Sequence, residues 1–271
     1  MFAVAVAAGF IGSMLGLGGG VIIIPALTLL FGRDMHEAIA ISAVTVIATS
    51  ISAASVHIRE GLVNIRLAFF LELSAVPGAI AGSRLGLWAN PAYLQGIFAV
   101  LLFYTACHML RSGGGDTNGC AALCEDDRDH PETVTFADKA TGELSSYRPK
   151  AMALGLAASL AAGVISGLLG VGAGFVKVPI MNLMMAVPLK AAIATSNYRA
   201  GISTTATAMI YFMHGYVKPM VVAPCAIGVL LGAQMGSHFC VRARSSVLRL
   251  AFVILLVYIS VQMLLRAIGG K

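Results

Sequence analysis

The chain has 271 residues, of which 58% are hydrophobic and 11% charged, and its mean hydropathy is +0.88. So little polar surface cannot cover a soluble globule, which excludes a water-soluble domain. The formal net charge of +6 comes mostly from single basic residues between apolar segments. We therefore expect no nucleic-acid partner.

Apolar segments of about 20 residues, the length that crosses a hydrocarbon core, recur along the chain. They predict an all-α polytopic membrane protein surrounded by a lipid bilayer. The extreme N-terminus lacks a basic region and a cleavage site, so we interpret it as the first structural segment. In chain order, the predicted helices cover 3–15, 20–32, 36–57, 66–87, 91–111, 152–169, 174–187, 189–213, 219–240 and 246–266.

Two apolar halves, 1–111 and 151–271, flank a polar connecting loop at 112–150. An offset of 154 positions, from Gly16 to Gly170, aligns them without a gap over 9–83. The chain is therefore an internal duplication, and its strongest identities are backbone-special residues.

The connecting loop carries Cys120 and Cys124 beside an acidic run. Their C-x3-C spacing matches no strong ligand pattern. We expect a solvated loop with reduced thiols, no metal, and no cofactor in the protein.

Each half holds a glycine cluster inside an apolar run, GLGGGVIIIP at Gly16–Pro25 and GVGAGFVKVP at Gly170–Pro179. Several glycines in five residues, followed by a proline, destabilise a helix far more than close packing requires. The first two segments of each half are short, so the glycines join them as a re-entrant hairpin or as one broken span. A hairpin leaves three spanning helices per half and inverts the second half, whereas a broken span leaves four and makes the halves parallel.

The basic residues favour the inverted repeats. With inverted halves, the side of the connecting loop collects most of the loop lysines and arginines, whereas parallel halves divide them more evenly. By the positive-inside rule, the connecting loop is cytoplasmic and both termini are outside. We expect a multi-pass protein of the cell inner membrane.

Glycines at every fourth position, over 78–86 and 228–236, predict close helix packing. The two clusters differ, because non-helical backbone at membrane depth is tolerated only where protein or a water-filled cavity covers it. Paired breaks mark the binding centre of many secondary transporters. Half-helices that begin after Gly20 and Gly174 would point positive dipole ends inward, which suits an anion.

Four motifs occur in the first half and are echoed in the second: G-x-G-G-G-x4-P at 16–25, A-x-S at 40–42, H-x-R-x-G at 57–61 and G-A-x-x-G-S at 78–83. In this combination the chain resembles the TauE/SafE sulfite exporter family, over nearly its whole length except 112–150. The resemblance implies transport, commonly export, of small anions such as sulfite, sulfoacetate or related sulfonates. The sequence departs from the family at Asn64 and Lys218, where an acidic residue is frequent, and in its longer connecting loop.

Candidate binding residues surround the two breaks. A charge in mid-helix costs about 2.5–3.5 kcal/mol, so Arg199 needs either an acid of the protein or a substrate anion. Lys177 follows the second break, where a cation adds to the positive dipole end and is unfavourable. Either a bound anion makes it favourable, or Lys177 extends to water and pairs with an acid of the protein. Hydroxyl and amide groups nearby could donate to anion oxygens. The predicted substrate site is Gly18, Gly19, Gly20, Ser42, Gly172, Gly174, Lys177, Ser196, Asn197 and Arg199.

Glu72 is the one carboxylate predicted well inside an apolar helix. It either carries a coupling proton or balances Arg199, and the sequence leaves both open. Histidines near helix ends are expected to pack at the membrane interface, without metal or haem geometry. These are His57, His108, His214 and His238.

These features favour a secondary transporter that binds a small anion between the two glycine breaks and works by alternating access. Coupling to a proton, uniport and a homodimer are left open. An anion channel could use the same half-helices. We do not expect an enzyme, because the predicted spans offer no nucleophile with a base, no carboxylate pair and no metal-ligand spacing.

Overall fold

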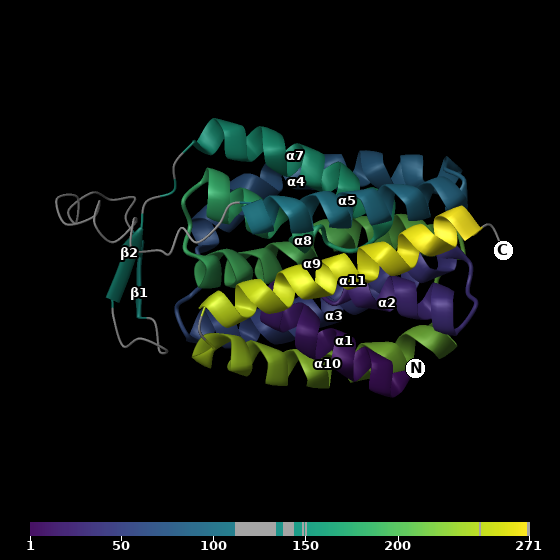
Figure 1. Ribbon diagram of the computed structural model, residues 1–271, viewed down its shortest axis with the longest axis horizontal. Helices are drawn as coiled ribbons and strands as arrows, with labels where there is room; N and C mark the ends of the chain where they lie inside the picture. The colour runs from purple at the N-terminus through teal and green to yellow at the C-terminus, as the bar shows by residue number, and fades with distance from the viewer. Residues whose placement is uncertain (112–133, 138–143, 148, 150, 244, 270–271) are drawn as a thin grey trace.

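The computed structural model describes residues 1–111, 134–137, 144–147, 149, 151–243 and 245–269. Its helices lie side by side along one long axis (Figure 1). The first half contains α1 Phe2–Leu15, α2 Gly20–Pro25, η1 Ala26–Leu30, α3 Met35–Arg59, α4 Ile65–Trp88 and α5 Pro91–Arg111. The second half repeats this order with α7 Met152–Leu169, α8 Gly174–Pro179, η2 Ile180–Met184, α9 Leu189–Met213, α10 Pro219–Arg242 and α11 Ser245–Gly269. The predicted helical class is confirmed.

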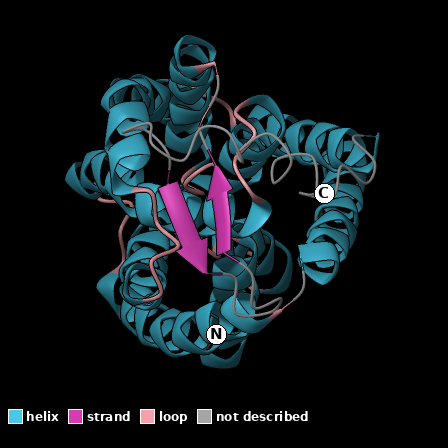
Figure 2. Cartoon of the chain, turned by 90° about the vertical axis from the view of Figure 1, so that its left-hand side faces the viewer, coloured by secondary structure: helices cyan, strands magenta, loops and turns pink. Residues whose placement is uncertain are grey.

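In the sequence, a two-stranded antiparallel hairpin lies between the two halves. Strand β1 Val134–Ala137 pairs with β2 Leu144–Tyr147. The strands lie beyond one end of the bundle and, viewed end-on, across its middle (Figures 1 and 2). The interpretation of 112–150 as a loop missed this hairpin. Cys120, Cys124 and the acidic run lie outside the described residues.

Each half begins with a helical hairpin whose tip is its glycine cluster. Helix α1 ends at Gly16, which has a left-handed φ of 76°, and α2 begins at Gly20. One small cavity is lined from both arms of this hairpin, by Met1, Val4 and Ala5 and by Ile23, Ala26, Leu27 and Phe31. In the second half, a Cβ on Gly155 of α7 would lie 2.7 Å from Sδ of Met185, which follows η2. The returning arms support the re-entrant interpretation over one broken span.

Each returning arm changes from α- to π-helix at its proline. Pro25 ends α2 and Pro179 ends α8, and η1 and η2 follow directly. Proline has no N–H for the i→i−4 ladder and its ring displaces the carbonyl of the preceding turn, so the wider π-helical spacing accommodates it.

The predicted glycine packing is confirmed. Helix α4 packs on α7, and α10 packs on α1. A Cβ on Gly82 would collide with the Val164 carbonyl oxygen of α7, and one on Gly236 with the Phe10 carbonyl oxygen of α1. Both partners correspond at the offset of 154, so each half packs its glycine helix on the first helix of the other half.

The central helices α3 and α9 run antiparallel. His36, at the start of α3, stacks at 5.4 Å on Tyr216, which follows α9. At the other end, the N–H of Asn64, which follows α3, donates to Oγ1 of Thr195 near the start of α9 at 3.2 Å. Because α3 and α9 are equivalent at the offset of 154, their opposite directions are those that inverted halves would have, and inversion itself stays a prediction.

The chain ends agree with this direction. The start of α1 and the end of α11 lie at the end of the bundle away from the β-hairpin (Figure 1). This is the arrangement that two halves with an odd number of passes each would have. Which end faces the cytoplasm stays a prediction.

Four helices of the described chain are long and apolar enough to cross a membrane, namely α3, α4, α7 and α10. The prediction that the first segment of each half is too short is therefore wrong for α7, whose 18 residues rise about 27 Å. The described apolar parts of α5 and α11, Pro91–Cys107 and Leu250–Gln262, are shorter. Helix α9 has 25 residues but carries Lys190, Asn197 and Arg199, which lower its hydropathy.

Candidate functional site

The two glycine tips meet inside the bundle. A Cβ on Gly174 would collide with the Gly16 carbonyl oxygen. A Cβ on Gly20 would lie 2.9 Å from Val171 Cα and 2.6 Å from Ser42 Oγ. The backbones of the opposed hairpins therefore approach each other at distances that only glycine allows.

The other predicted glycines form the turns of the two tips. Gly18, Gly19 and Gly172 have φ of 70°, 76° and 71°, in the left-handed region that favours glycine. Gly18 and Gly172 both lie against Val46 of α3, because a Cβ on either glycine would touch its side chain. The sequence therefore located both tips correctly.

The predicted serines fasten each central helix to the hairpin of the other half. Ser42 of α3 donates to the Gly170 carbonyl at 3.0 Å, and Ser196 of α9 donates to the Gly16 carbonyl at 2.9 Å. A broken helix leaves such carbonyls without N–H partners. These hydroxyls therefore satisfy the backbone of the breaks, and their contact with substrate stays a prediction.

Asn197 makes a third link of this kind. Its Nδ2 donates to the Ser13 carbonyl in the last turn of α1 at 2.7 Å. Its side chain is fully buried. The equivalent position in the first half is Ala43, so this link has no counterpart there.

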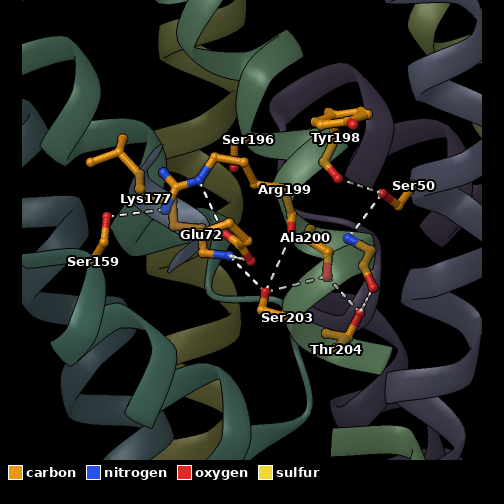
Figure 3. Close-up of polar contacts among 12 residues, drawn as sticks. Ser50, Glu72, Ser159, Lys177, Ser196, Tyr198, Arg199, Ala200, Ser203 and Thr204 are labelled. Carbon is orange, nitrogen blue, oxygen red and sulfur yellow. Dashed lines mark hydrogen bonds and ion pairs between the residues drawn. The ribbon is translucent and has the colours of Figure 1, made fainter. Parts of the chain in front are cut away.

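A charged cluster from three helices lies beside the second tip. Nε of Arg199 (α9) donates to Oε2 of Glu72 (α4) at 3.1 Å, and Nζ of Lys177 (α8) donates to Oε1 at 3.4 Å. All three residues are at most 3% exposed. The partner of Arg199 is thus an acid of the protein, as one of the two predicted alternatives required. Figure 3 shows Glu72 between the two cations.

Neutral groups complete this cluster. Lys177 Nζ donates to Ser203 Oγ at 2.7 Å, and Arg199 Nη2 donates to Ser159 Oγ at 3.0 Å (Figure 3). Nη1 of Arg199 lies 3.8 Å from Sδ of Met181. Two cations and one carboxylate leave a formal charge of +1 inside the protein, where an unbalanced charge is costly. The cluster can therefore gain from a bound anion.

Several functional candidates were missed or misplaced by the sequence. Ser159 and Ser203 carry little signal, because serines are common in membrane helices. His57 was predicted at the interface, but it is fully buried against Asn197, with Nε2 3.4 Å from the amide nitrogen. Within the described residues, no three His, Cys, Asp or Glu side chains group as metal ligands.

The two departures from the family pattern have structural partners. Asn64 caps α4 by accepting from Leu67 N–H at 3.0 Å, and a hydrogen bond joins its side chain to Tyr147 of β2. Burial raises the pKa of Tyr147 to about 12. Lys218 Nζ pairs with Oε2 of Glu37 at 3.0 Å. Each of the two residues therefore links neighbouring elements at one end of the bundle.

This fold and site define a polytopic membrane protein in which two inward-facing hairpins meet beside a buried charged cluster. The family model for "Sulfite exporter TauE/SafE" matches residues 1–263. The chain therefore belongs to the TauE/SafE sulfite exporter family, a family of membrane transporters, and the predicted resemblance is confirmed.

Similar proteins are named as probable transporters. The chain is 27% identical to probable membrane transporter protein YunE of Bacillus subtilis (strain 168), over 96% of this chain and 95% of that protein. It is 27% identical to probable membrane transporter protein YdhB of the same organism, over 88% and 87%. Probable membrane transporter protein MamO of Paramagnetospirillum magneticum is 26% identical over 86% of this chain and 38% of its own length. No solved structure matches significantly.

Proposed function

We propose that this protein is a secondary transporter that exports small sulfur-containing or organic anions, such as sulfite, sulfoacetate or other sulfonates, across the cell inner membrane. One observation carries the proposal: a buried cluster with a formal charge of +1 adjoins the place where the hairpin tips meet. The name of the family favours sulfite among these anions.

The cluster suits an oxyanion because its two cations are not held equally closely by Glu72. The contact of Lys177 with Glu72, at 3.4 Å, is longer than the 3.1 Å contact of Arg199. An anion can approach Lys177 with the smaller loss, while the Glu72–Arg199 pair stays intact. In this low-dielectric interior, charge-assisted hydrogen bonds to the anion oxygens are strong.

The reciprocal links between the halves support alternating access. The Ser42–Gly170 and Ser196–Gly16 hydrogen bonds hold each central helix to the opposite hairpin tip. Rocking one half against the other would exchange these bonds and expose the anion on one side at a time. An anion channel remains the alternative, and a membrane-embedded enzyme is disfavoured.

The first experiment measures anion-dependent thermal stability of the purified protein in detergent. The panel is sulfite, sulfate, thiosulfate, sulfoacetate, taurine, acetate and phosphate. A ligand that binds the folded state raises its apparent stability. Lys177→Met keeps a neutral Glu72–Arg199 pair, so it should fold but lose the effect. Lys218→Met, which removes a lysine paired with Glu37 outside the cluster, should respond like wild type.

Two results would count against the proposal: no anion stabilises the wild type, or Lys177→Met responds as the wild type does. Flux in liposomes then separates a carrier from a channel. A carrier preloaded with an unlabelled anion accelerates the entry of labelled anion by counterflow. A channel does not.

A further inference from the structure

His57 is unusual among the histidines whose side chains are described. His214 and His238 are exposed, and their Nδ1 atoms lie 2.8 and 2.7 Å from carbonyl oxygens four residues earlier. His57, in the last turn of α3, is fully buried, and its Nδ1 has no hydrogen-bond partner in the described chain. A buried polar atom left unpaired is costly, so each one calls for an explanation, of which a functional role is one.

The neighbouring amide fixes the tautomer of the neutral ring. Asn197 Nδ2 lies 2.7 Å from the Ser13 carbonyl, which can only accept, so this atom is the N–H donor. His57 Nε2 lies 3.4 Å from the same donor and therefore accepts. The neutral ring then carries its proton on Nδ1. The Oδ1 atom of Asn197 also has no partner among the described residues.

A second proton on the ring would change these contacts. Protonation at Nε2 places an N–H against the Asn197 amide N–H. Rotating the amide turns the unpaired Oδ1 toward the new N–H and withdraws Nδ2 from the Ser13 carbonyl. That carbonyl lies in the last turn of α1, immediately before the first glycine tip. The proton therefore controls one of the bonds that hold the first hairpin to α9.

We propose that His57 is the proton-binding site that couples anion transport to proton movement, with Asn197 as the relay to the first hairpin tip. The inference rests on the proposed transport function and deepens it. The site occurs in one half only, since the equivalents of His57 and Asn197 are Tyr211 and Ala43. The duplicated fold therefore does not require the His57–Asn197 pair, since the second half folds without it.

Other groups facing His57 give the proton a route. Glu60, just beyond α3, and His238 of α10 act electrostatically on its charge. Its neighbour on α9 is the uncharged Asn197, which in turn donates to the Ser13 carbonyl of α1. Glu60 is half-buried and His238 exposed. In this proposal Glu60 is the acid between water and the ring, at the end of α3 predicted to face the cytoplasm.

Helix α9 connects this proton site with the charged cluster. Asn197 and Arg199 are two residues apart, which places them about 200° apart around the helix. One side chain therefore contacts the first hairpin while the other binds Glu72. A proton on Glu72 instead would leave Lys177 and Arg199 buried without their carboxylate. His57 carries the proton without breaking up the anion site.

The test uses the full-length protein in liposomes with a trapped pH-sensitive dye and sulfite as the probe. Wild type is expected to move protons with a sulfite gradient and to exchange sulfite for sulfite. His57→Gln should lose the proton movement and the pH dependence but keep the exchange, which also shows that it is folded. His214→Gln is the matched control and should behave as wild type. Proton movement by His57→Gln at the wild-type ratio would overturn the proposal.

A second variant tests the relay. Asn197→Asp places a carboxylate beside the ring and favours its charged form, so the pH midpoint of sulfite exchange should rise by roughly one to three units. An unchanged midpoint contradicts the relay. If wild type exchanges sulfite without moving protons, the coupling inference fails and the transporter stands. If it exchanges no anion of the panel, both fail.

Discussion

Glu72 accepts hydrogen bonds from two cations at once, so its replacement should affect both stability and the response to anions. In Glu72→Gln, Lys177 and Arg199 stay buried without a carboxylate, so the free energy of unfolding should fall by about 3–5 kcal/mol in the absence of anion. A bound anion would then replace the lost charge. Sulfite should therefore raise the thermal unfolding temperature of this variant more than that of wild type.

The matched control is Glu37→Gln. Glu37 also binds two cations, Arg33 and Lys218, but the Lys218 side chain is 55% exposed. Water screens that site, so the loss should be only about 1 kcal/mol and independent of sulfite. An equal anion response in both variants would show that the buried cluster is not special.

Tyr147 provides a residue-level prediction for high pH. Burial raises its pKa from 10.0 to about 12, and the Asn64 hydrogen bond opposes this shift. The folded state thus favours the neutral phenol. Its contribution, about 3 kcal/mol for two pH units, is complete below pH 10 and is lost as the pH rises through 12. In an absorbance titration of tyrosinate, the difference between wild type and Tyr147→Phe should be one late step. A difference centred at pH 10 would contradict the buried position.

At the scale of elements, close backbone contact makes α4 and α7 sensitive to a single methyl group. A Cβ on Gly163 would collide with the Ala75 carbonyl oxygen and lie 2.9 Å from Ala75 Cα. Gly163→Ala should therefore lower the free energy of unfolding by about 1–3 kcal/mol. Gly96 of α5 has no atom within 4 Å of an added Cβ, so Gly96→Ala should not lower it. Comparing the unfolding temperatures of the two variants checks this.

The helices could be predicted closely because length, hydropathy and glycine or proline all act locally. The helices predicted at 36–57 and 66–87 are observed as α3 Met35–Arg59 and α4 Ile65–Trp88. The β-hairpin could not be predicted in this way, because its Tyr147 is buried and hydrogen-bonded to Asn64, which lies far away in sequence.

The candidate site could be predicted only in part, because its individual residues carry a local signal but their pairing does not. Arg199 and Lys177 stood out because charges inside apolar helices are rare. Their shared partner Glu72 is 127 and 105 residues away, and no local pattern encodes that pairing. His57 was misplaced because a helix end can lie inside the bundle, and only packing decides which residues it faces.

At the scale of the whole molecule, the duplicated sequence provides a direct test of inversion. Gly61 and Gly215 are equivalent positions, in the α3–α4 and α9–α10 turns, and no atom lies within 4 Å of an added Cβ at either. The antiparallel course of α3 and α9 places the two turns at opposite ends of the bundle. Inverted halves therefore expose them on opposite sides of the membrane, whereas parallel halves expose them on the same side.

The measurement replaces the five native cysteines and introduces Gly61→Cys or Gly215→Cys, one at a time. Both positions have positive φ, so each substitution carries a similar cost of about 1–2 kcal/mol, and the pair is matched. A membrane-impermeant maleimide added to intact cells should label residue 215 but not 61, and inside-out vesicles should reverse this. Labelling of both from one side would contradict inversion. It would also remove the geometric basis for a site shared between two opposed hairpins, because the tips could then not face each other across a twofold axis in the membrane plane.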